Sequence, residues 1–194
     1  MTKINKELIL EKAAVLFAAS GKEEFSIRKL AMSIPISPSV LYHYFADEQI
    51  LLREMFDYLN TSLGRKRERL PQPSTASEML RQRIIFQLDN AGSIVAVLKY
   101  YVSHRRDFPK FKNGFVPDKS ALHIEEVLRH GTKTKEFYSK NITDDAKVIT
   151  HAINGFLLEY YPYQPKGKEK KELVDRIHSF LIKALRGGEE NENT

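Results

Sequence analysis

Residues 26–45 form the stretch SIRKLAMSIPISPSVLYHYF, which decides the fold. Ser26 is a suitable helix cap, because its hydroxyl can accept a hydrogen bond from the first turn of the helix that follows. This helix ends at the Pro-Ile-Ser break over residues 35–37. A second short helix begins at Pro38, where the missing proline N–H costs nothing. The stretch therefore predicts two short helices joined by a tight turn. The apolar residues on the inner face of the first helix are Ile27, Leu30, Ala31 and Ile34.

A longer amphipathic helix precedes these two, from about Asn5 to Ser20, and Gly21 ends it. Three helices in this order predict a helix-turn-helix unit. The third is too short to be stable alone, so the other two must hold it, which leaves its other face free to enter the major groove of DNA. We expect its inner side to consist of Ile36, Leu41 and Phe45. We expect its outer side to consist of Ser37, Ser39, Val40, Tyr42, His43 and Tyr44.

The N-terminal sequence resembles the tetracycline-repressor (TetR) family. The matching segments are FAASG (17–21), SIRKLA (26–31), ISPSVLYHYFAD (36–47) and ILL (50–52). The family pattern is a helix ending in Phe-x-x-x-Gly, then Thr/Ser-Ile-x-x-Ile/Leu-Ala, then a recognition helix ending in Leu-Tyr-x-Tyr/His-Phe. The resemblance implies an all-α homodimeric transcriptional regulator. It would have an N-terminal helix-turn-helix domain that binds DNA and a C-terminal helical domain that binds an effector.

The resemblance also implies which residues contact DNA. Ser26 and Arg28, with the adjacent Lys29, would meet the phosphate backbone. Such contacts set the register of a protein on the duplex, whereas contacts with base edges set its sequence preference. On the third helix, Ser37, Ser39, Val40 and His43 would approach phosphates or base edges, and Tyr42 and Tyr44 would donate hydrogen bonds to phosphate oxygens. The alternatives are that both tyrosines are ordinary packing residues and that His43 is merely solvated.

Two positions depart from the family pattern. Pro35 stands in the turn where the family usually has glycine, so we expect a different backbone path there. Glu48 follows the cap of the fourth helix, where the family usually has a lysine that points at a phosphate. A carboxylate suits the helix dipole at this place but repels DNA. We therefore expect either weaker DNA binding or slightly different docking on DNA than in a typical relative.

Beyond this unit, apolar residues keep helical spacing along the chain. Asp47 is a candidate cap for the fourth helix, and Pro71-Gln72-Pro73-Ser74 is a candidate domain boundary. Further helices are expected at 75–90, 92–106, 118–131, 143–161 and 168–186, about nine in all. We predict a helix-turn-helix domain at 1–46, a connecting helix at 47–70, a helical effector-binding and dimerisation domain at 71–187 and a disordered tail at 188–194.

Composition excludes several other functions. The 194 residues include no cysteine, which rules out disulfides, thiolate metal sites and cysteine nucleophiles. No apolar run is long enough for a membrane span and the N-terminus is unlike a targeting signal, so we expect a cytoplasmic protein. The formal charge of +6 suits a polyanionic partner. The basic excess is spread over the chain, however, so charge permits DNA binding without indicating it.

One cluster of side chains has the spacing of a metal site. His123, Glu126 and His130 lie at i, i+3 and i+7 and so share a helix face. No further ligand is evident, and such trios are usually polar surface. A nucleophile elbow, a phosphate-binding glycine loop and a carboxylate pair are all missing from the sequence. We therefore predict no metal site, no cofactor and no enzymatic activity.

Aromatic residues suggest where an effector binds. Most of them suit ordinary core packing, but the family resemblance implies an effector between the helices of the second domain. We expect an apolar or aromatic pocket there. The residues that we assign to it are Phe86, Tyr100, Tyr101, Phe108, Phe115, Phe156 and Tyr160.

The last two helices carry the argument for a dimer. Each has an apolar stripe, and the final helix has further apolar residues away from its stripe. A helix that is apolar on two sides packs on two sides, which a four-helix bundle with a second subunit would satisfy. The alternative is burial within one subunit. The stripes consist of Ile149, Ile153, Phe156, Leu157 and Tyr160, and of Leu173, Ile177, Phe180, Leu181 and Ala184.

These features predict a repressor dimer whose recognition helices occupy successive major grooves of a near-palindromic operator. A small-molecule effector would release the DNA by favouring a conformation in which the spacing of those helices no longer fits. The alternative is a helical ligand-binding or interaction module whose DNA binding has decayed. Pro35 and Glu48 would then be symptoms of that decay.

Overall fold

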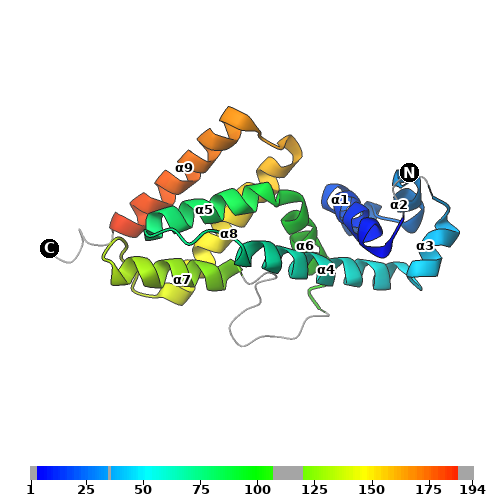
Figure 1. The fold of residues 1–194 in the computed structure, drawn as a ribbon, viewed down its shortest axis with the longest axis horizontal. Helices are drawn as coiled ribbons and strands as arrows, with labels where there is room; N and C mark the ends of the chain where they lie inside the picture. The colour runs from blue at the N-terminus through cyan, green and yellow to red at the C-terminus, as the bar shows by residue number, and fades with distance from the viewer. Residues whose placement is uncertain (1–3, 35, 107–119, 188–194) are drawn as a thin grey trace. The chain divides into compact units, whose positions relative to one another are not determined.

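The computed structural model describes residues 4–34, 36–106 and 120–187. Over these ranges the chain forms α-helices and one short 3-10 helix, with no strand, so the all-α prediction is confirmed (Figure 1). The chain divides into two compact units, which we call unit 1 (residues 1–68 and 92–117) and unit 2 (residues 69–91 and 118–194). Within the described ranges, no helix combines the length and apolarity that a bilayer span requires.

Unit 1 holds the predicted helix-turn-helix. Its helices are α1 (Lys6–Glu24), α2 (Ile27–Ser33), α3 (Pro38–Tyr44), α4 (Glu48–Glu68) and nearly all of α6 (Ala91–Ser103). α1 packs against α4, and α2 packs against both α1 and α3. The short helix α3 therefore packs on α2, and α2 packs on the long helix α1 (Figure 1).

The predicted caps are present at three helix starts. The side-chain oxygen of Asn5 accepts from the N–H of Leu8 at 2.8 Å, and that of Asp47 accepts from Ile50 at 2.8 Å. The Ser26 hydroxyl accepts from the N–H of Lys29 at 3.2 Å. Gly21 has φ 73° and interrupts the helical backbone of α1, a conformation that other residues adopt with strain.

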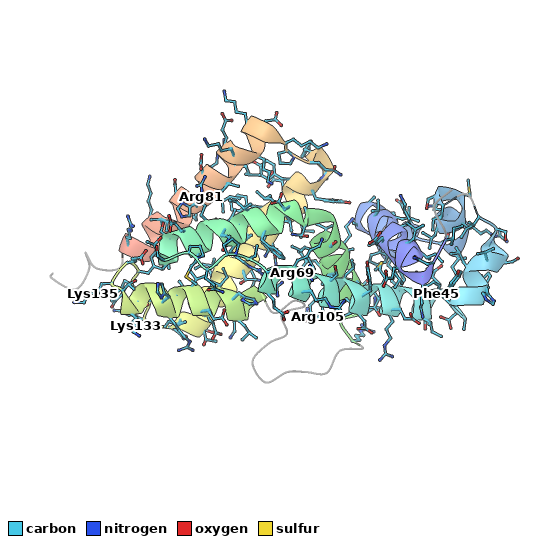
Figure 2. All side chains as sticks on the ribbon, viewed as in Figure 1. Phe45, Arg69, Arg81, Arg105, Lys133 and Lys135 are labelled. Carbon is cyan, nitrogen blue, oxygen red and sulfur yellow. The ribbon has the colours of Figure 1, made fainter. Side chains whose placement is uncertain are left out.

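The inner side of α3 holds it in place. Leu41 and Phe45 are buried, and Ile36 is half-buried, so this prediction is confirmed (Phe45 is labelled in Figure 2). α1 and α4 are also joined at the surface by polar contacts. Lys6 pairs with Glu54 at 2.5 Å, and the Tyr58 hydroxyl donates to Glu11 at 3.0 Å. Burial and this carboxylate together raise the pKa of Tyr58 to about 12.

Unit 2 is built from α5 (Ala76–Asp89), α7 (Ser120–Lys133), α8 (Ile142–Tyr160), the 3-10 helix η1 (Tyr161–Tyr163) and α9 (Gly167–Arg186). α7 packs along α8, and α5 packs against α7, α8 and α9. Polar bridges join α5 to α9: Arg81 pairs with Asp175 (Arg81 is labelled in Figure 2), and the Ser77 hydroxyl lies 3.2 Å from a ring nitrogen of His178.

The apolar stripes that suggested a dimer lie mostly inside unit 2. Ile149 and Ile153 of α8 share one buried cluster with Leu173, Ile177 and Leu181 of α9. The apolar residues of these stripes are therefore buried within one subunit. This is the alternative to burial against a second subunit that the sequence left open. Phe180 and Ala184 are exceptions, because both are exposed.

Several helix limits differ from the prediction, and one short helix was not predicted. α6 ends at Ser103 rather than at residue 106, and the Ser103 hydroxyl donates back to the carbonyl oxygen of Lys99 at 2.9 Å. η1 was not predicted, and it follows α8 directly. Gln164 closes it in the left-handed region, with φ 42°. This conformation turns the chain toward α9.

Candidate DNA-binding interface

The outer face of α3 is open to solvent in unit 1. Tyr42 is 56% exposed although it is aromatic and lies between the buried Leu41 and the exposed His43. An aromatic residue that is held this open by a rigid short helix is available to a partner. The exposed residues of this face are Ser37, Ser39, Val40, Tyr42 and His43.

The two serines that begin the short helices differ in what their hydroxyls do. The Ser26 hydroxyl oxygen accepts from the N–H of Lys29 as the cap of α2, which leaves its O–H able to donate, but Ser26 is half-buried. Ser37 precedes Pro38 at the start of α3, and its side chain makes no capping hydrogen bond. The Ser37 hydroxyl is exposed. Of the two, Ser37 is therefore the better placed to donate to a phosphate.

Three further residues predicted to contact DNA differ in whether they already make hydrogen bonds within the protein. Arg28 is exposed on α2. The ammonium group of Lys29 donates to the carbonyl oxygen of Glu24 at 2.7 Å, so it already caps the end of the preceding segment. The Tyr44 hydroxyl donates to the carbonyl oxygen of Ile4 at 3.3 Å and is half-buried. Lys29 and Tyr44 therefore have structural roles within unit 1.

The sequence reasoning missed one exposed residue beside this face. Met32, on α2, is 82% exposed. Met32 does not belong to the inner face formed by Leu30, Ala31 and Ile34. Its position could have been predicted, because an apolar residue on the polar side of an amphipathic helix is exposed.

The two departures from the family pattern fall in different places. Pro35 lies outside the described residues. Glu48 is the first residue of α4, directly after the cap Asp47, and it is half-buried. Ile36 N–H donates to the carbonyl oxygen of Ala31 at 3.2 Å, which closes the turn between α2 and α3.

The described effector residues that we predicted are divided between the two units. Tyr100 is in the core of unit 1, where its ring lies 4.8 Å from that of Phe56 and 6.3 Å from that of Phe17. Tyr101 belongs to the same unit and is half-buried. Phe108 and Phe115 lie outside the described residues. The remaining three are in unit 2: Phe86 is buried, and Phe156 and Tyr160 are half-buried.

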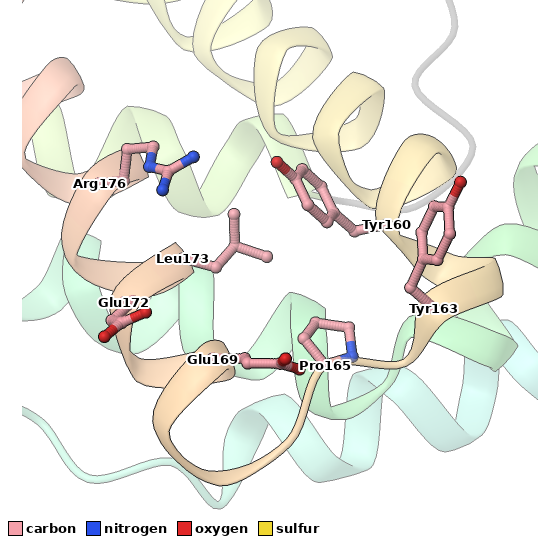
Figure 3. Close-up of a pocket in the computed structure, with 7 residues that line it drawn as sticks. All are labelled: Tyr160, Tyr163, Pro165, Glu169, Glu172, Leu173 and Arg176. Carbon is pink, nitrogen blue, oxygen red and sulfur yellow. The ribbon is translucent and has the colours of Figure 1, made fainter.

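A cavity of about 440 Å³ lies in unit 2 where η1 leads into α9 (Figure 3). Figure 3 shows the rings of Tyr160 and Tyr163 on one side of it and the side chain of Leu173 facing them. Tyr160 is the predicted effector residue that lines it. The other lining residues are Pro165, Glu169, Glu172 and Arg176. Glu169, Glu172 and Arg176 of α9 are charged and exposed to solvent. The cavity is therefore an open groove rather than an enclosed pocket.

The predicted trio on α7 does not assemble as a metal site. His123 lies 3.1 Å from the carboxylate of Glu126. The ring of His130 instead contacts the carbonyl oxygen of Ser74 at 3.2 Å. Within the described part of the chain, no three His, Asp or Glu side chains are grouped closely enough to hold a metal ion.

A known family accounts for the geometry of unit 1. Residues 9–55 match the model of the bacterial regulatory proteins of the tetR family. Residues 9–55 therefore form an N-terminal domain of the tetR type. The match covers α1 to α3 and the first part of α4, so the TetR domain model includes all of the exposed α3 face described above.

Solved TetR structures share the whole fold. A bacterial regulatory protein of the tetR family from Rhodococcus RHA1 is 16% identical, with a TM-score of 0.66 over 95% of this chain and 98% of that one. PfmR from Thermus thermophilus is 20% identical, with a TM-score of 0.66 over 90% and 97%. FadR from Bacillus subtilis, in complex with stearoyl-CoA, is 16% identical, with a TM-score of 0.65 over 92% and 98%. No curated protein sequence matches the chain.

Proposed function

We propose that this chain is a TetR-type repressor that binds a near-palindromic operator as a homodimer and releases it when a small molecule binds unit 2. The exposed polar face of α3 carries the proposal. Its inner residues Leu41 and Phe45 are buried, so the helix is fixed while Tyr42 and His43 remain free to meet DNA. A rigid helix presented in this way fits the major groove.

We assign the DNA contacts by what each side chain has available. Ser37, Ser39 and Tyr42 offer exposed hydroxyls to phosphate oxygens, and Arg28 offers its guanidinium group. Val40 and His43 would face base edges. Tyr44 would donate to a phosphate only by giving up its hydrogen bond to Ile4. Ser26 accepts from Lys29 and the Lys29 ammonium donates once, so both side chains keep a donor for a phosphate.

A dimer would use the outer faces of α8 and α9. Val148 and Leu158 on α8 and Phe180 on α9 are large apolar side chains left exposed by a single subunit. Gly155 lies between the first two on the same face, and a Cβ added there would meet no atom within 4 Å. A helix of a second subunit can therefore approach closely at Gly155, as four-helix packing requires.

The groove lined by Tyr160, Glu172 and Arg176 borders this dimer face. Glu172 and Arg176 precede Phe180 at helical spacing on α9 and are exposed with it. A partner subunit would cover this side of α9. We therefore place the effector elsewhere in unit 2.

Binding of the purified protein to its own upstream DNA and to random duplex, across a range of salt concentrations, tests the proposal. A regulator binds one near-palindromic site preferentially, with an affinity that falls steeply with salt. Equal binding to both duplexes, followed by a genomic selection that returns no site, would contradict the proposal. It would favour the alternative of a helical ligand-binding or interaction module that has lost DNA binding. Transcription from the bound promoter with and without the protein distinguishes repression from activation.

A further inference from the structure

Four polar side chains are buried in unit 2 in a regular arrangement. Arg83 and Gln87 lie at i and i+4 on α5, and Thr150 and Asn154 lie at i and i+4 on α8. Residues with this spacing share one face of a helix. α5 packs against α8. Their exposed fractions are 4%, 1%, 0% and 7% respectively, so all four are removed from water.

Three oxygen atoms in this group have no hydrogen-bond partner. They are Oε1 of Gln87, Oγ1 of Thr150 and Oδ1 of Asn154. Buried polar atoms in native proteins are almost always paired, because leaving one unpaired costs its full desolvation. Three such atoms on two packed helices therefore mark a place where another molecule supplies the missing donors.

The two helices that carry these oxygens also contribute to the buried apolar cluster of unit 2. Ile84 follows Arg83 on α5, and Ile149 and Ile153 each precede one of the polar residues on α8; all three belong to the buried cluster of unit 2. Hydrogen bonds are stronger in such a low-dielectric environment than in water. A ligand that satisfied these oxygens would therefore be held firmly and in one orientation.

Arg83 adds a fixed positive charge to the same face of α5. Its guanidinium group lies over the ring of Phe86, 5.3 Å from the ring centroid. Arginine keeps its charge in a buried site and favours planar anions such as carboxylates. The polar group thus combines one cation with three oxygens that accept hydrogen bonds.

We infer that Arg83, Gln87, Thr150 and Asn154 bind the effector, and that the effector is a small organic anion carrying hydroxyl or N–H groups. The inference rests on the proposed function, because it names the ligand that would release the DNA. The carboxylate or phosphate of the ligand faces Arg83. Its donors meet the three oxygens, which a saturated acyl chain could not satisfy.

The stability of the ligand-free protein gives the first test. Thr150→Val and Gln87→Met remove unpaired buried oxygens at nearly constant volume, so each is expected to raise Tm by a few degrees. Thr143→Val, at a half-buried position on the same helix, is the control and is expected to leave Tm nearly unchanged. A fall in Tm for Thr150→Val and Gln87→Met would mean that these oxygens are bonded within the fold and would overturn the inference.

Binding of two matched probes gives the second test. 3,4-Dihydroxybenzoate carries a carboxylate and two hydroxyl donors on a rigid ring, and benzoate lacks only the hydroxyls. Calorimetry on the full-length protein is expected to show at least about tenfold tighter binding of the dihydroxy acid, since each hydroxyl satisfies a buried acceptor. Thr150→Val and Gln87→Met are expected to remove this preference. Equal affinity for the two acids, or no binding of either, overturns the ligand class.

Operator binding separates this inference from the proposed function. The Thr150→Val and Gln87→Met variants are expected to bind DNA as tightly as the wild type, and to keep it when the dihydroxy acid is added. If the wild-type protein binds no operator, the proposed function fails. If it binds an operator and the dihydroxy acid releases the wild type and the variants alike, only the ligand site is wrong.

Discussion

Lys99 on α6 donates a hydrogen bond from its ammonium group to the carbonyl oxygen of Ala18, in the last regular turn of α1, at 2.6 Å. The same group lies 3.2 Å from the carbonyl oxygen of Ala19. Gly21 interrupts the helix just beyond, so these carbonyls lie at the negative end of the α1 dipole. Lys99 thus joins the end of α1 to α6 inside unit 1.

Replacing Lys99 by methionine is expected to lower the free energy of unfolding of unit 1 by about 1–2 kcal/mol, because a charged donor to helix C-terminal carbonyls is lost. Denaturant unfolding measures the change. Lys22→Met removes an equal charge from an exposed position near the same helix end and serves as the control. Equal losses for the two variants would show that charge alone matters, not the contact with Ala18.

Tyr42→Phe removes only the hydroxyl from the exposed ring of α3. We expect about 10- to 150-fold weaker operator binding, since one hydrogen bond to a charged phosphate is worth roughly 1.5–3 kcal/mol. The loss should be similar for all duplex sequences, because phosphate contacts carry no sequence information. Fluorescence anisotropy with labelled duplexes measures it. Tyr163→Phe, an exposed tyrosine of unit 2, should bind like the wild type. Unchanged affinity in Tyr42→Phe would remove Tyr42 from the interface.

Glu48→Lys restores the residue type that the family pattern has at the start of α4. It is expected to tighten DNA binding about three- to tenfold at low salt and to steepen the salt dependence by about one counterion. Titrations at several salt concentrations measure both quantities. Glu159→Lys makes the same charge change on an exposed residue of α8 and controls for net charge. An identical gain in both variants would show that Glu48 does not face the phosphate backbone.

Local signals made much of unit 1 predictable. A cap such as Asn5, Ser26 or Asp47 acts on an N–H three residues away, so both partners lie in one short window of sequence. The buried side of α3 follows from the same local spacing, because Leu41 and Phe45 lie one turn apart. Both partners of each interaction are therefore visible in one short stretch of sequence, which is why these elements could be predicted.

Contacts between distant segments were not predictable in this way. Lys99 and Ala18 are 81 positions apart, and no pattern near either residue names the other. The stripes of α8 and α9 pose a related problem. Periodicity identifies an apolar face such as that of Ile153, but not whether the helix covering it belongs to the same chain. The buried Gln87 and Thr150 were missed because single polar residues on helices usually face water.

Glu136 ties the end of α7 to the start of α5. Its carboxylate accepts from the N–H of Ala76 at 3.0 Å and of Ser77 at 3.2 Å, and from the Thr134 hydroxyl at 2.9 Å. Burial alone would raise the pKa of Glu136, but these hydrogen bonds and the charge of His130 outweigh burial and lower the pKa below its ordinary value of 4.5.

The lowered pKa of Glu136 makes its contribution to stability depend on pH. The contribution is fully present above the unfolded value of 4.5 and is lost as the pH falls through the lower folded value. Glu136→Gln is therefore expected to be less stable than the wild type at neutral pH and to lose less stability on acidification. Thermal unfolding at a series of pH values measures this, with Glu159→Gln as a control carboxylate. Parallel pH profiles for the wild type and Glu136→Gln would contradict the assignment.

Phe180→Glu tests the proposed dimer face without disturbing the core of unit 2. The Phe180 side chain is 64% exposed in a single subunit, so a charged residue there costs the monomer little. In a dimer it would be buried beside its symmetry mate, where an unpaired charge is strongly unfavourable. We expect the variant to sediment as a monomer, to retain its helical content and to bind a half-site more weakly than the dimer binds the full operator. Leu122→Glu makes a similar change at an exposed position of α7 and should remain dimeric. A dimeric Phe180→Glu would place the interface on another surface, because one like-charge pair at the centre of a helical bundle is enough to separate the subunits.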